Sequence, residues 1–232
     1  MSMRHRTREG RLAYIGPAGE RGREYFAVTV HTDGRRILRA RSEIDEGEVL
    51  RDVLCAVDAD WRPLDAFVRL TVEDRFVGTG WYVFDGEGGA CESFNVEDGR
   101  LSQLLDAAAP LQTFGSHAIA SDAWMTTAFD FSRPDEDQWV TGSLISSLAF
   151  NGSTGPRLHR IGYGLRYRGL ETPQVPAGTP ETHHFEFLFE GTVVDDHPPY
   201  HVWTTADDDR LIVRAHVGEP KDYLYQLVSL TG

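Results

Sequence analysis

Short segments of alternating apolar residues, separated by turn residues about every 8–12 positions, constrain the fold of this chain more than any other feature. Phe26, Val28 and Val30 alternate with smaller side chains, and Asp33-Gly34 then turns the chain into a return strand near 36–44. Further strands are expected near residues 49–57, 64–72, 76–84, 161–168, 182–190, 200–205, 210–217 and 223–230. Such spacing is typical of antiparallel β sandwiches and barrels.

The sequence therefore predicts a mainly β protein. We expect a single strongly curved antiparallel sheet or open barrel of about ten or more strands, with one short helix and a central cavity. The helix is expected at Leu101–Ala109, where Pro110 would end it.

The domain organisation follows from the same pattern. Residues 1–23 are rich in Arg, Gly and Glu and are expected to be loosely ordered, so that one domain covers residues 24–232. The segment 58–64 resembles 206–211, which suggests two related halves at about 24–100 and 157–232.

The composition limits the classes of partner that the protein is expected to bind. The chain has 232 residues, 41% of them hydrophobic, with 5 Trp, 12 Phe and 8 Tyr, which is enough for a sizeable core. Its net charge of −13 argues against nucleic-acid binding and against an anionic membrane surface. No apolar signal region or membrane-spanning stretch is evident, so a cytoplasmic protein without membrane insertion is expected. Cys55 and Cys91 are then expected to be buried, reduced thiols.

Strong cofactor motifs are absent from the sequence. There is no phosphate-binding loop, dinucleotide fingerprint, zinc-protease H-E-x-x-H, C-x-x-C or G-x-S-x-G. His183 and His184 are adjacent on an expected strand, so their rings point to opposite faces of the sheet and cannot share a metal. We therefore predict neither a metal nor a cofactor. Whether His183 or His184 faces the cavity stays open.

A family resemblance appears in the middle of the chain. Phe114-Gly115-Ser116-His117-Ala118-Ile119 precedes Asp122-Ala123-Trp124, and further on come Val175-Pro176-Ala177-Gly178-Thr179, His184-Phe185 and Trp203. This order resembles bacterial domains of unknown function of the DUF3108 type, which are similar in shape to LolA-like lipoprotein carriers and to lipocalins. The resemblance covers roughly residues 110–230. It implies a curved antiparallel sheet around an apolar cavity, although LolA-like carriers are exported and no signal is expected here.

The candidate site residues combine titratable and aromatic side chains. His117, in a loop-like context, and His184 are the candidates for proton transfer. Strand arginines could hold a carboxylate, and aromatic rings could line a pocket for a flat ligand. The substrate-binding candidates are Arg41, Arg214, His183, Trp81, Tyr82, Trp124 and Trp203.

Two functional hypotheses follow. The first is a cofactor-independent enzyme, a lyase, decarboxylase or isomerase, that acts on a small apolar or aromatic carboxylate or carbonyl compound. The alternative is a non-catalytic binding protein for a lipid or another hydrophobic small molecule. Both take a small hydrophobic or aromatic partner, and both are compatible with a homo-oligomer.

Overall fold

The computed structural model describes residues 5–194 and 196–232 and contains fifteen strands, one α-helix and one short 3₁₀ helix. The helical elements are α1 (Ile119–Met125) and η1 (Thr126–Ala128). The strands are β1 (His5–Gly16), β2 (Gly19–His31), β3 (Arg36–Ile44), β4 (Val49–Val57), β5 (Pro63–Val72), β6 (Arg75–Phe84), β7 (Gly88–Asn95), β8 (Gly99–Asp106), β9 (Thr113–Gly115), β10 (Gln138–Ile145), β11 (His159–Glu171), β12 (Thr182–Leu188), β13 (Tyr200–Thr205), β14 (Ile212–Val217) and β15 (Tyr223–Thr231).

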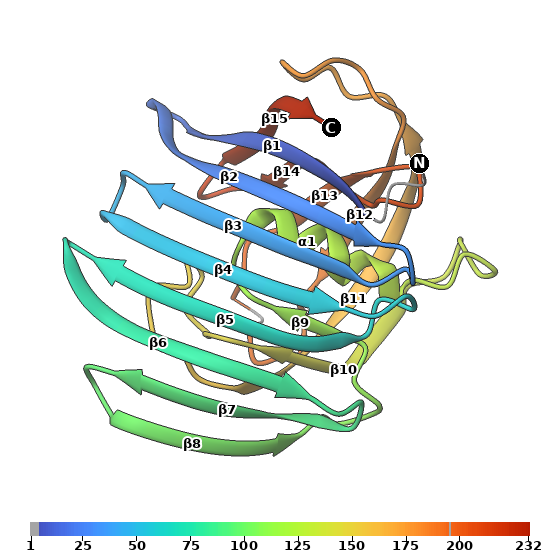
Figure 1. Cartoon of the computed structure of the whole chain (residues 1–232). Coiled ribbons are helices and arrows are strands. Elements are labelled where there is room, and N and C mark those ends of the chain that lie inside the picture. Colours follow the sequence, from blue (N-terminus) through green and yellow to red (C-terminus); the bar gives the residue numbers. More distant parts are fainter. Residues whose placement is uncertain (1–4, 195) are drawn as a thin grey trace.

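All fifteen strands belong to one sheet. Its order is β8-β7-β6-β5-β4-β3-β2-β1-β15-β14-β13-β12-β11-β10-β9, so the first strand of the chain lies in the middle, beside the last. Every neighbouring pair is antiparallel except β9 and β10, which are parallel. The sheet curls so that β2 to β8 lie on one side of α1 and β10 to β13 on the other (Figure 1). The predicted fold class, a mainly β protein with one curved sheet and one short helix, is confirmed.

Strict alternation explains why the predicted strands form. In β3 the side chains of Leu38, Ala40 and Ile44 are buried, while Arg39 and Arg41 between them are exposed. Strands β3, β4 and β13 have the predicted bounds, because turn residues lie on both sides of each of them.

The prediction for residues 1–23 is wrong in the described part of that segment. Residues 5–16 form β1, which pairs with β2 and β15, and β2 already begins at Gly19. The charged residues of β1 hide the strand pattern in the sequence. They can lie in a strand because residues from distant parts of the chain form ion pairs with them. Arg6 and Arg8, for example, both lie against the buried Asp209.

The predicted helix at Leu101–Ala109 is also wrong, because residues 99–106 form strand β8. Leu101, Leu104 and Leu105 have the i, i+3, i+4 spacing of a helix face. In the structure Leu101 and Leu105 are half-buried, whereas Leu104 points outward and is 81% exposed. A single exposed leucine therefore made a strand resemble a helix.

The helix that does form, α1, packs against the concave side of the sheet. It contacts β3, β9, β13 and β14, and Ala120, Ala123 and Trp124 are among its buried residues. The N-cap residue Ala118 makes no side-chain hydrogen bond to the helix. The carboxylate of Glu24 on β2 takes this role, since it accepts hydrogen bonds from the backbone N–H groups of Ile119 at 3.0 Å and Ala120 at 2.8 Å.

The sheet does not close into a barrel by strand pairing, since β8 and β9 form its two edges. Side chains close the seam instead. The amide of Gln103 on β8 bonds both backbone groups of Leu158, accepting from its N–H at 2.9 Å and donating to its carbonyl at 3.2 Å. The Tyr82 hydroxyl donates to the carbonyl of Arg157 at 3.2 Å, next to this bridge.

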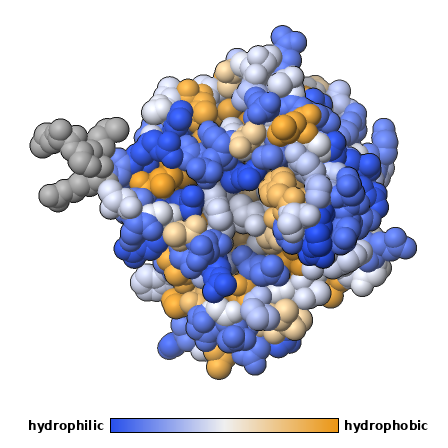
Figure 2. Space-filling model, turned by 90° about the vertical axis from the view of Figure 1, so that its right-hand side faces the viewer, coloured by the Kyte–Doolittle hydropathy of each residue, from blue (hydrophilic) through white to orange (hydrophobic). Residues whose placement is uncertain are grey.

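The cysteines, the helices and the surface bear on three simpler expectations. Cys55 and Cys91 are buried, free thiols, and burial raises their pKa values to about 12 and about 11. Within residues 5–194 and 196–232, none of the helices is of a length and apolarity that would let it cross a bilayer. Hydrophilic residues predominate over the end of the molecule at the right of Figure 1, with scattered hydrophobic ones between them (Figure 2).

Candidate functional site

A partly enclosed cavity lies between α1 and the concave face of the sheet. Its volume is about 120 Å³. It lies toward the end where strands β3 and β14 finish, at the left of Figure 1. Apolar side chains form most of its wall: Ile44, Ile119, Met125, Ile145, Leu148, Phe150, Ile161, Phe187, Phe189, Val194 and Val217. The polar side chains on it come from separate elements: Tyr14, Arg21, Arg51, His117, Asp122, Ser147, Asn151, His197, Tyr200 and Tyr225.

Asp122 and Tyr200 form the polar pair at the helix side of this cavity. Asp122 is on α1, and the hydroxyl of Tyr200, the first residue of β13, donates a hydrogen bond of 2.7 Å to its Oδ2. Burial, together with the nearby Glu24 carboxylate, raises the pKa of Asp122 to about 7, although the bond from Tyr200 opposes the shift. A carboxyl group with this pKa can donate or accept a proton near neutral pH.

Arg51 is a buried cation that is held by backbone carbonyl groups. It is 2% exposed and points inward from β4 between Val49 and Val53. Its Nη1 donates to the carbonyl of His117 at 2.8 Å, and its Nη2 donates to the carbonyls of Asn151 at 2.6 Å and Gly152 at 2.7 Å. The guanidinium therefore fastens the loop around residue 151 to the interior. Burial lowers its pKa.

His117 lines the cavity as predicted, but its surroundings favour the neutral ring. Its φ of 63° places the residue in a left-handed conformation at the start of the turn into α1. The ring Nε2 lies 2.8 Å from the carbonyl of Ser147, so this nitrogen carries the proton and donates. Burial and the neighbouring Arg51 lower the pKa of His117 to about 3. A ring with so low a pKa is a weak base, which makes Asp122 the better candidate for proton transfer.

The Glu24 carboxylate completes the buried polar groups next to the cavity. Besides capping α1, its Oε2 accepts hydrogen bonds from Tyr14 at 2.6 Å and Ser42 at 2.7 Å. Tyr14 packs edge-on against Tyr225, with 4.7 Å between the ring centroids, and both rings line the cavity. Four donors thus satisfy a carboxylate that is 0% exposed, and its role is to hold the helix in place.

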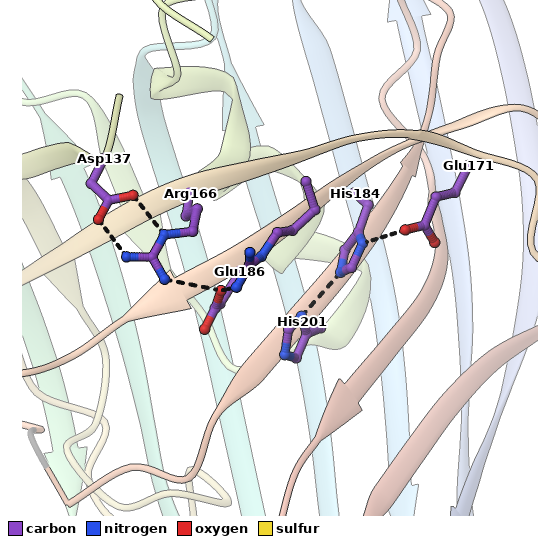
Figure 3. A network of polar contacts seen from close by, with 7 residues as sticks. Asp137, Arg166, Glu171, His184, Glu186 and His201 are labelled. Carbon is purple, nitrogen blue, oxygen red and sulfur yellow. Dashed lines mark hydrogen bonds and ion pairs between the residues drawn. The ribbon is translucent and has the colours of Figure 1, made fainter. Parts of the chain in front are cut away.

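His184 lies on the other face of the sheet from the cavity. Its partner on β13 is Trp203, and the two rings stack at 4.0 Å. Nδ1 of His184 donates to Oε1 of Glu171 at 2.8 Å, and Nε2 lies 3.0 Å from Nδ1 of His201 (Figure 3). Burial lowers the pKa of His184, and the Glu171 carboxylate opposes that shift.

The alternation along β12 settles which histidine faces inward. His183 lies on the side of Phe185 and Phe187, with its Nδ1 2.9 Å from the hydroxyl of Tyr167. It packs against Phe131, with 4.8 Å between ring centroids, and does not line the cavity. Beside His184 on the outer face, Arg166 binds Asp137 through two hydrogen bonds and also contacts Glu186 (Figure 3).

The other predicted site residues are dispersed. Arg41 and Trp81 are 58% and 66% exposed on the outer face, and Arg214 lies over the ring of Trp203 on that face. Tyr82 is in the core, and Trp124 packs against Trp61 beside a second, much smaller cavity. Of the nine predicted residues only His117 lines the main cavity. The expectation that they surround one pocket is therefore wrong, because strands that alternate in and out carry half of their side chains away from it.

Sequence reasoning missed Asp122, Tyr200 and Arg51 as site residues. For Arg51 a signal was present, because a charged side chain stands in the apolar register between Val49 and Val53. Glu24 gives the same signal two residues before Phe26. A charge at an inward position of a strand must have buried partners, so such residues point to the interior polar groups. No group of three or more metal-ligating side chains occurs in the part of the chain that the structure describes.

Comparisons with known proteins support the fold. Neither protein-family models nor curated proteins match the sequence. Among solved structures, the chain is similar to a β-barrel-like protein of the domain of unknown function DUF1849 from Brucella abortus, with a TM-score of 0.54, 10% identity and coverage of 98% of this chain and 96% of that one. It also matches a DUF1089 family protein from Pseudomonas aeruginosa, with a TM-score of 0.49, 11% identity and coverage of 82% and 87%. The first of these similarities shows that the chain has a β-barrel-like fold.

Proposed function

We propose that this protein binds a small, largely apolar and uncharged molecule in the cavity between α1 and the sheet. The observation that carries the proposal is a partly enclosed space of about 120 Å³ whose wall is mostly aliphatic and aromatic and carries the hydrogen-bonded pair Asp122 and Tyr200. A dry apolar cavity of about 150 Å³ in another protein holds benzene, so a single ring or a short branched chain matches this space.

The polar groups favour a carbonyl or hydroxyl ligand over a carboxylate. Both arginines at the cavity are already engaged, since Arg51 donates to three backbone carbonyls and Arg21 donates to the carboxylate of Glu46 at 2.8 Å. Arg41 and Arg214, expected as carboxylate clamps, lie on the outer face. Asp122, while it is protonated, can donate a hydrogen bond to a carbonyl oxygen, and the Tyr200 hydroxyl donates to the other oxygen of the same carboxyl group. An anionic ligand would leave its charge unpaired in the interior.

The resemblance to DUF3108-type domains and LolA-like carriers supports the same proposal, since those folds surround an apolar cavity. The carriers hold long acyl chains, whereas the space here suits a much smaller molecule. We therefore place this chain with binding proteins for small hydrophobic compounds and not with lipid carriers.

Binding can be tested with benzaldehyde, benzyl alcohol and benzoate as probes in calorimetry and ligand-observed NMR. The neutral probes should bind and raise the unfolding temperature, whereas benzoate should bind at least about tenfold more weakly because its charge finds no partner. Ile161→Phe, which fills the cavity wall, should abolish binding, and Phe67→Leu, a change of an aromatic side chain that does not line the cavity, should leave it intact. Equal binding by the Ile161→Phe variant would refute the proposed location.

A second candidate is a cofactor-independent enzyme of the isomerase type, and the Asp122–Tyr200 pair favours it. An ionised Asp122 can take a proton from the carbon next to a carbonyl group, and the Tyr200 hydroxyl, which donates to the Asp122 carboxylate beforehand, can then turn to donate to the oxygen that becomes negative. Return of the proton to a different carbon would then isomerise the substrate. His117 would not take part in the proton transfer, because its low pKa keeps the ring neutral.

Hydrogen exchange separates the two candidates. With acetophenone in D₂O, an enzyme of this kind should catalyse exchange of the methyl hydrogens, which NMR follows directly. Asp122→Asn should bind the ketone but lose exchange by about 100-fold or more, since general acid–base groups contribute about 10²–10⁴-fold. Binding without any exchange in the unaltered protein would leave the binding function and eliminate the enzymatic one.

A further inference from the structure

Strand β8 is an edge of the sheet, and its contacts across the seam run through side chains, such as those of Gln103 to Leu158 and of Arg160 to the Asp106 carbonyl. It pairs with β7 on one side, and along its other side no strand pairs with it in the residues that the structure describes. Figure 1 shows β7 and β8 at the lower border of the sheet, with no element below them. Edge strands of this length present unpaired N–H and C=O groups, and natural proteins cover or disguise them.

The outer face beside this edge is unusually apolar. Trp81, Val83, Phe94 and Leu104 are 66%, 60%, 50% and 81% exposed. Strand register places Val83 next to Ala90 and Ala90 next to Leu104, so the apolar surface runs from β6 to the edge. We call these four large side chains the edge patch. An apolar surface that reaches an unpaired edge favours association with another sheet.

The direction of the β8 backbone groups can be deduced from the contacts around it. The N–H of Ala107, just after β8, donates to the carbonyl of Glu87 on the β7 side. The carbonyl of Asp106 instead accepts a bond from the Arg160 side chain, outside that pair. Because the direction alternates along a strand, the even-numbered residues Arg100, Ser102, Leu104 and Asp106 point their backbone groups to the free edge. Their side chains are the exposed ones.

We propose that β8 is the interface of a homodimer, in which β8 of one copy pairs antiparallel with β8 of a second copy about a two-fold axis at Gln103. This register sets Arg100 of each copy opposite Asp106 of the other, and Ser102 opposite Leu104. All four pairs join residues whose backbone groups face the edge, so each can form ladder hydrogen bonds. The Asp106 carbonyl has a second lone pair besides the one that Arg160 uses.

Charge complementarity is what identifies a second copy as the occupant. The chain carries a net charge of −13, so two copies repel each other in most orientations. In this register two Arg–Asp pairs lie directly across the interface, and the two Leu104 side chains become diagonal neighbours on one face. A shift of two residues in one direction would set Asp106 opposite Asp98, which brings like charges together, and the same shift in the other direction would set Arg100 opposite Ala108 and lose both Arg–Asp pairs. The two-fold symmetry is that of most homodimers, and it extends one sheet across both copies.

Sedimentation velocity over a range of protein concentrations tests this interface. The unaltered protein should form a dimer. Arg100→Asp and Asp106→Arg should each weaken it by more than roughly tenfold, because each turns both cross-pairs into like charges. A mixture of the two variants should form dimers again, since an acidic edge then meets a basic one. Arg39→Asp and Asp52→Arg, exposed on the same outer face but away from the edge, are the matched controls and should leave the dimer unchanged.

Three outcomes would overturn the proposal. One is a monomer at every concentration. Another is a dimer that neither charge variant weakens, and the third is a pair of weakened variants that fail to form dimers when mixed. Leu104→Lys provides an independent check, because it breaks the apolar contact without altering the Arg–Asp pairs, and it too should shift the protein to monomers. Circular dichroism of each variant shows that the sheet is still folded. The result does not depend on ligand binding, so the proposed function is tested separately.

Discussion

The buried side chain of Asp122 makes the charge in the cavity and the stability of this protein depend on pH. Its carboxyl group is enclosed between α1 and the first residue of β13, and its closest polar partner is the Tyr200 hydroxyl. Burial outweighs that hydrogen bond, so the folded protein holds the proton of Asp122 up to about pH 7. Whatever the cavity binds, its polar end meets a group that changes charge near neutrality.

A stability measurement can detect this proton. The unfolded chain loses it near pH 3.8, whereas the folded protein keeps it until about pH 7. Between these values the folded state binds more protons, so the contribution of Asp122 to the free energy of unfolding decreases as the pH rises. The free energy of unfolding of the unaltered protein is compared with that of the Asp122→Asn variant. The difference, unaltered protein minus variant, should decrease by up to about 4 kcal/mol from pH 4 to pH 7.

Urea unfolding at several pH values measures this difference. Asp52→Asn, an exposed carboxylate on β4, serves as the control and should show little pH-dependent difference from the unaltered protein. A flat difference for Asp122→Asn across the same range would contradict the raised pKa.

At the scale of elements, α1 depends on a residue far away in the sequence. Its N-cap makes no side-chain hydrogen bond, and the groups that cap it belong to Glu24, 95 and 96 residues earlier. This is why the sequence could not predict the helix, which has seven residues and no local start signal. Strands β3 and β4 were predictable because their signal, alternation between two turns, is local.

The same contrast between local and distant signals explains which site residues could be predicted from the sequence. Asp122 lies in a segment that the sequence analysis had singled out, yet nothing local shows that this segment packs inside the sheet. Arg51 and Glu24 were recognisable as charges at inward positions, but their partners come from loops and a helix that only the three-dimensional arrangement brings near. His184 was correctly placed on a strand, and its assignment to the cavity was wrong because alternation turns it outward.

Substitution of Glu24 measures what the helix contributes. Glu24→Gln replaces one acceptor oxygen by an amide that cannot accept from the Tyr14, Ser42 or backbone donors, so buried donors lose their partner. We expect a loss of about 2–4 kcal/mol in the free energy of unfolding. The exposed Glu20→Gln on the same strand breaks a surface pair with Arg11 and should cost less than about 1 kcal/mol. Similar losses in both variants would argue against the capping role.

On the scale of the whole molecule, the first and the last strand lie side by side at the centre of the sheet. Strand β1 pairs with β15 from Glu9 opposite Thr231 to Ile15 opposite Leu224, and Gly232 lies against the backbone of Thr7. The two meanders that leave this central pair run in opposite directions around α1 (Figure 1). The ends of the described chain are therefore neighbours, although the strands at the sheet edges come from its middle.

Circular permutation tests this arrangement. A chain in which a short Gly/Ser linker joins Gly232 to the start of β1, with new ends in the exposed turn at Asp33–Gly34, should fold to the same sheet, since permutation is tolerated at such turns. New ends between Leu38 and Arg39 cut β3 within the core and should prevent folding, because Leu38 is fully buried. Circular dichroism and thermal unfolding compare the two. Failure of the first permutant and success of the second would contradict the pairing of β1 with β15.

The seam at Gln103 has a mechanical consequence. A barrel closed by continuous strand pairing can widen only by breaking a full row of backbone hydrogen bonds. In this open sheet, two hydrogen bonds from the amide of Gln103 close the seam instead. Breaking these two hydrogen bonds and the few side-chain contacts beside them leaves every strand pair intact. Widening the interior at this seam would therefore break side-chain contacts but no row of backbone hydrogen bonds, and the seam lies at the same edge of the sheet where a second copy would pair.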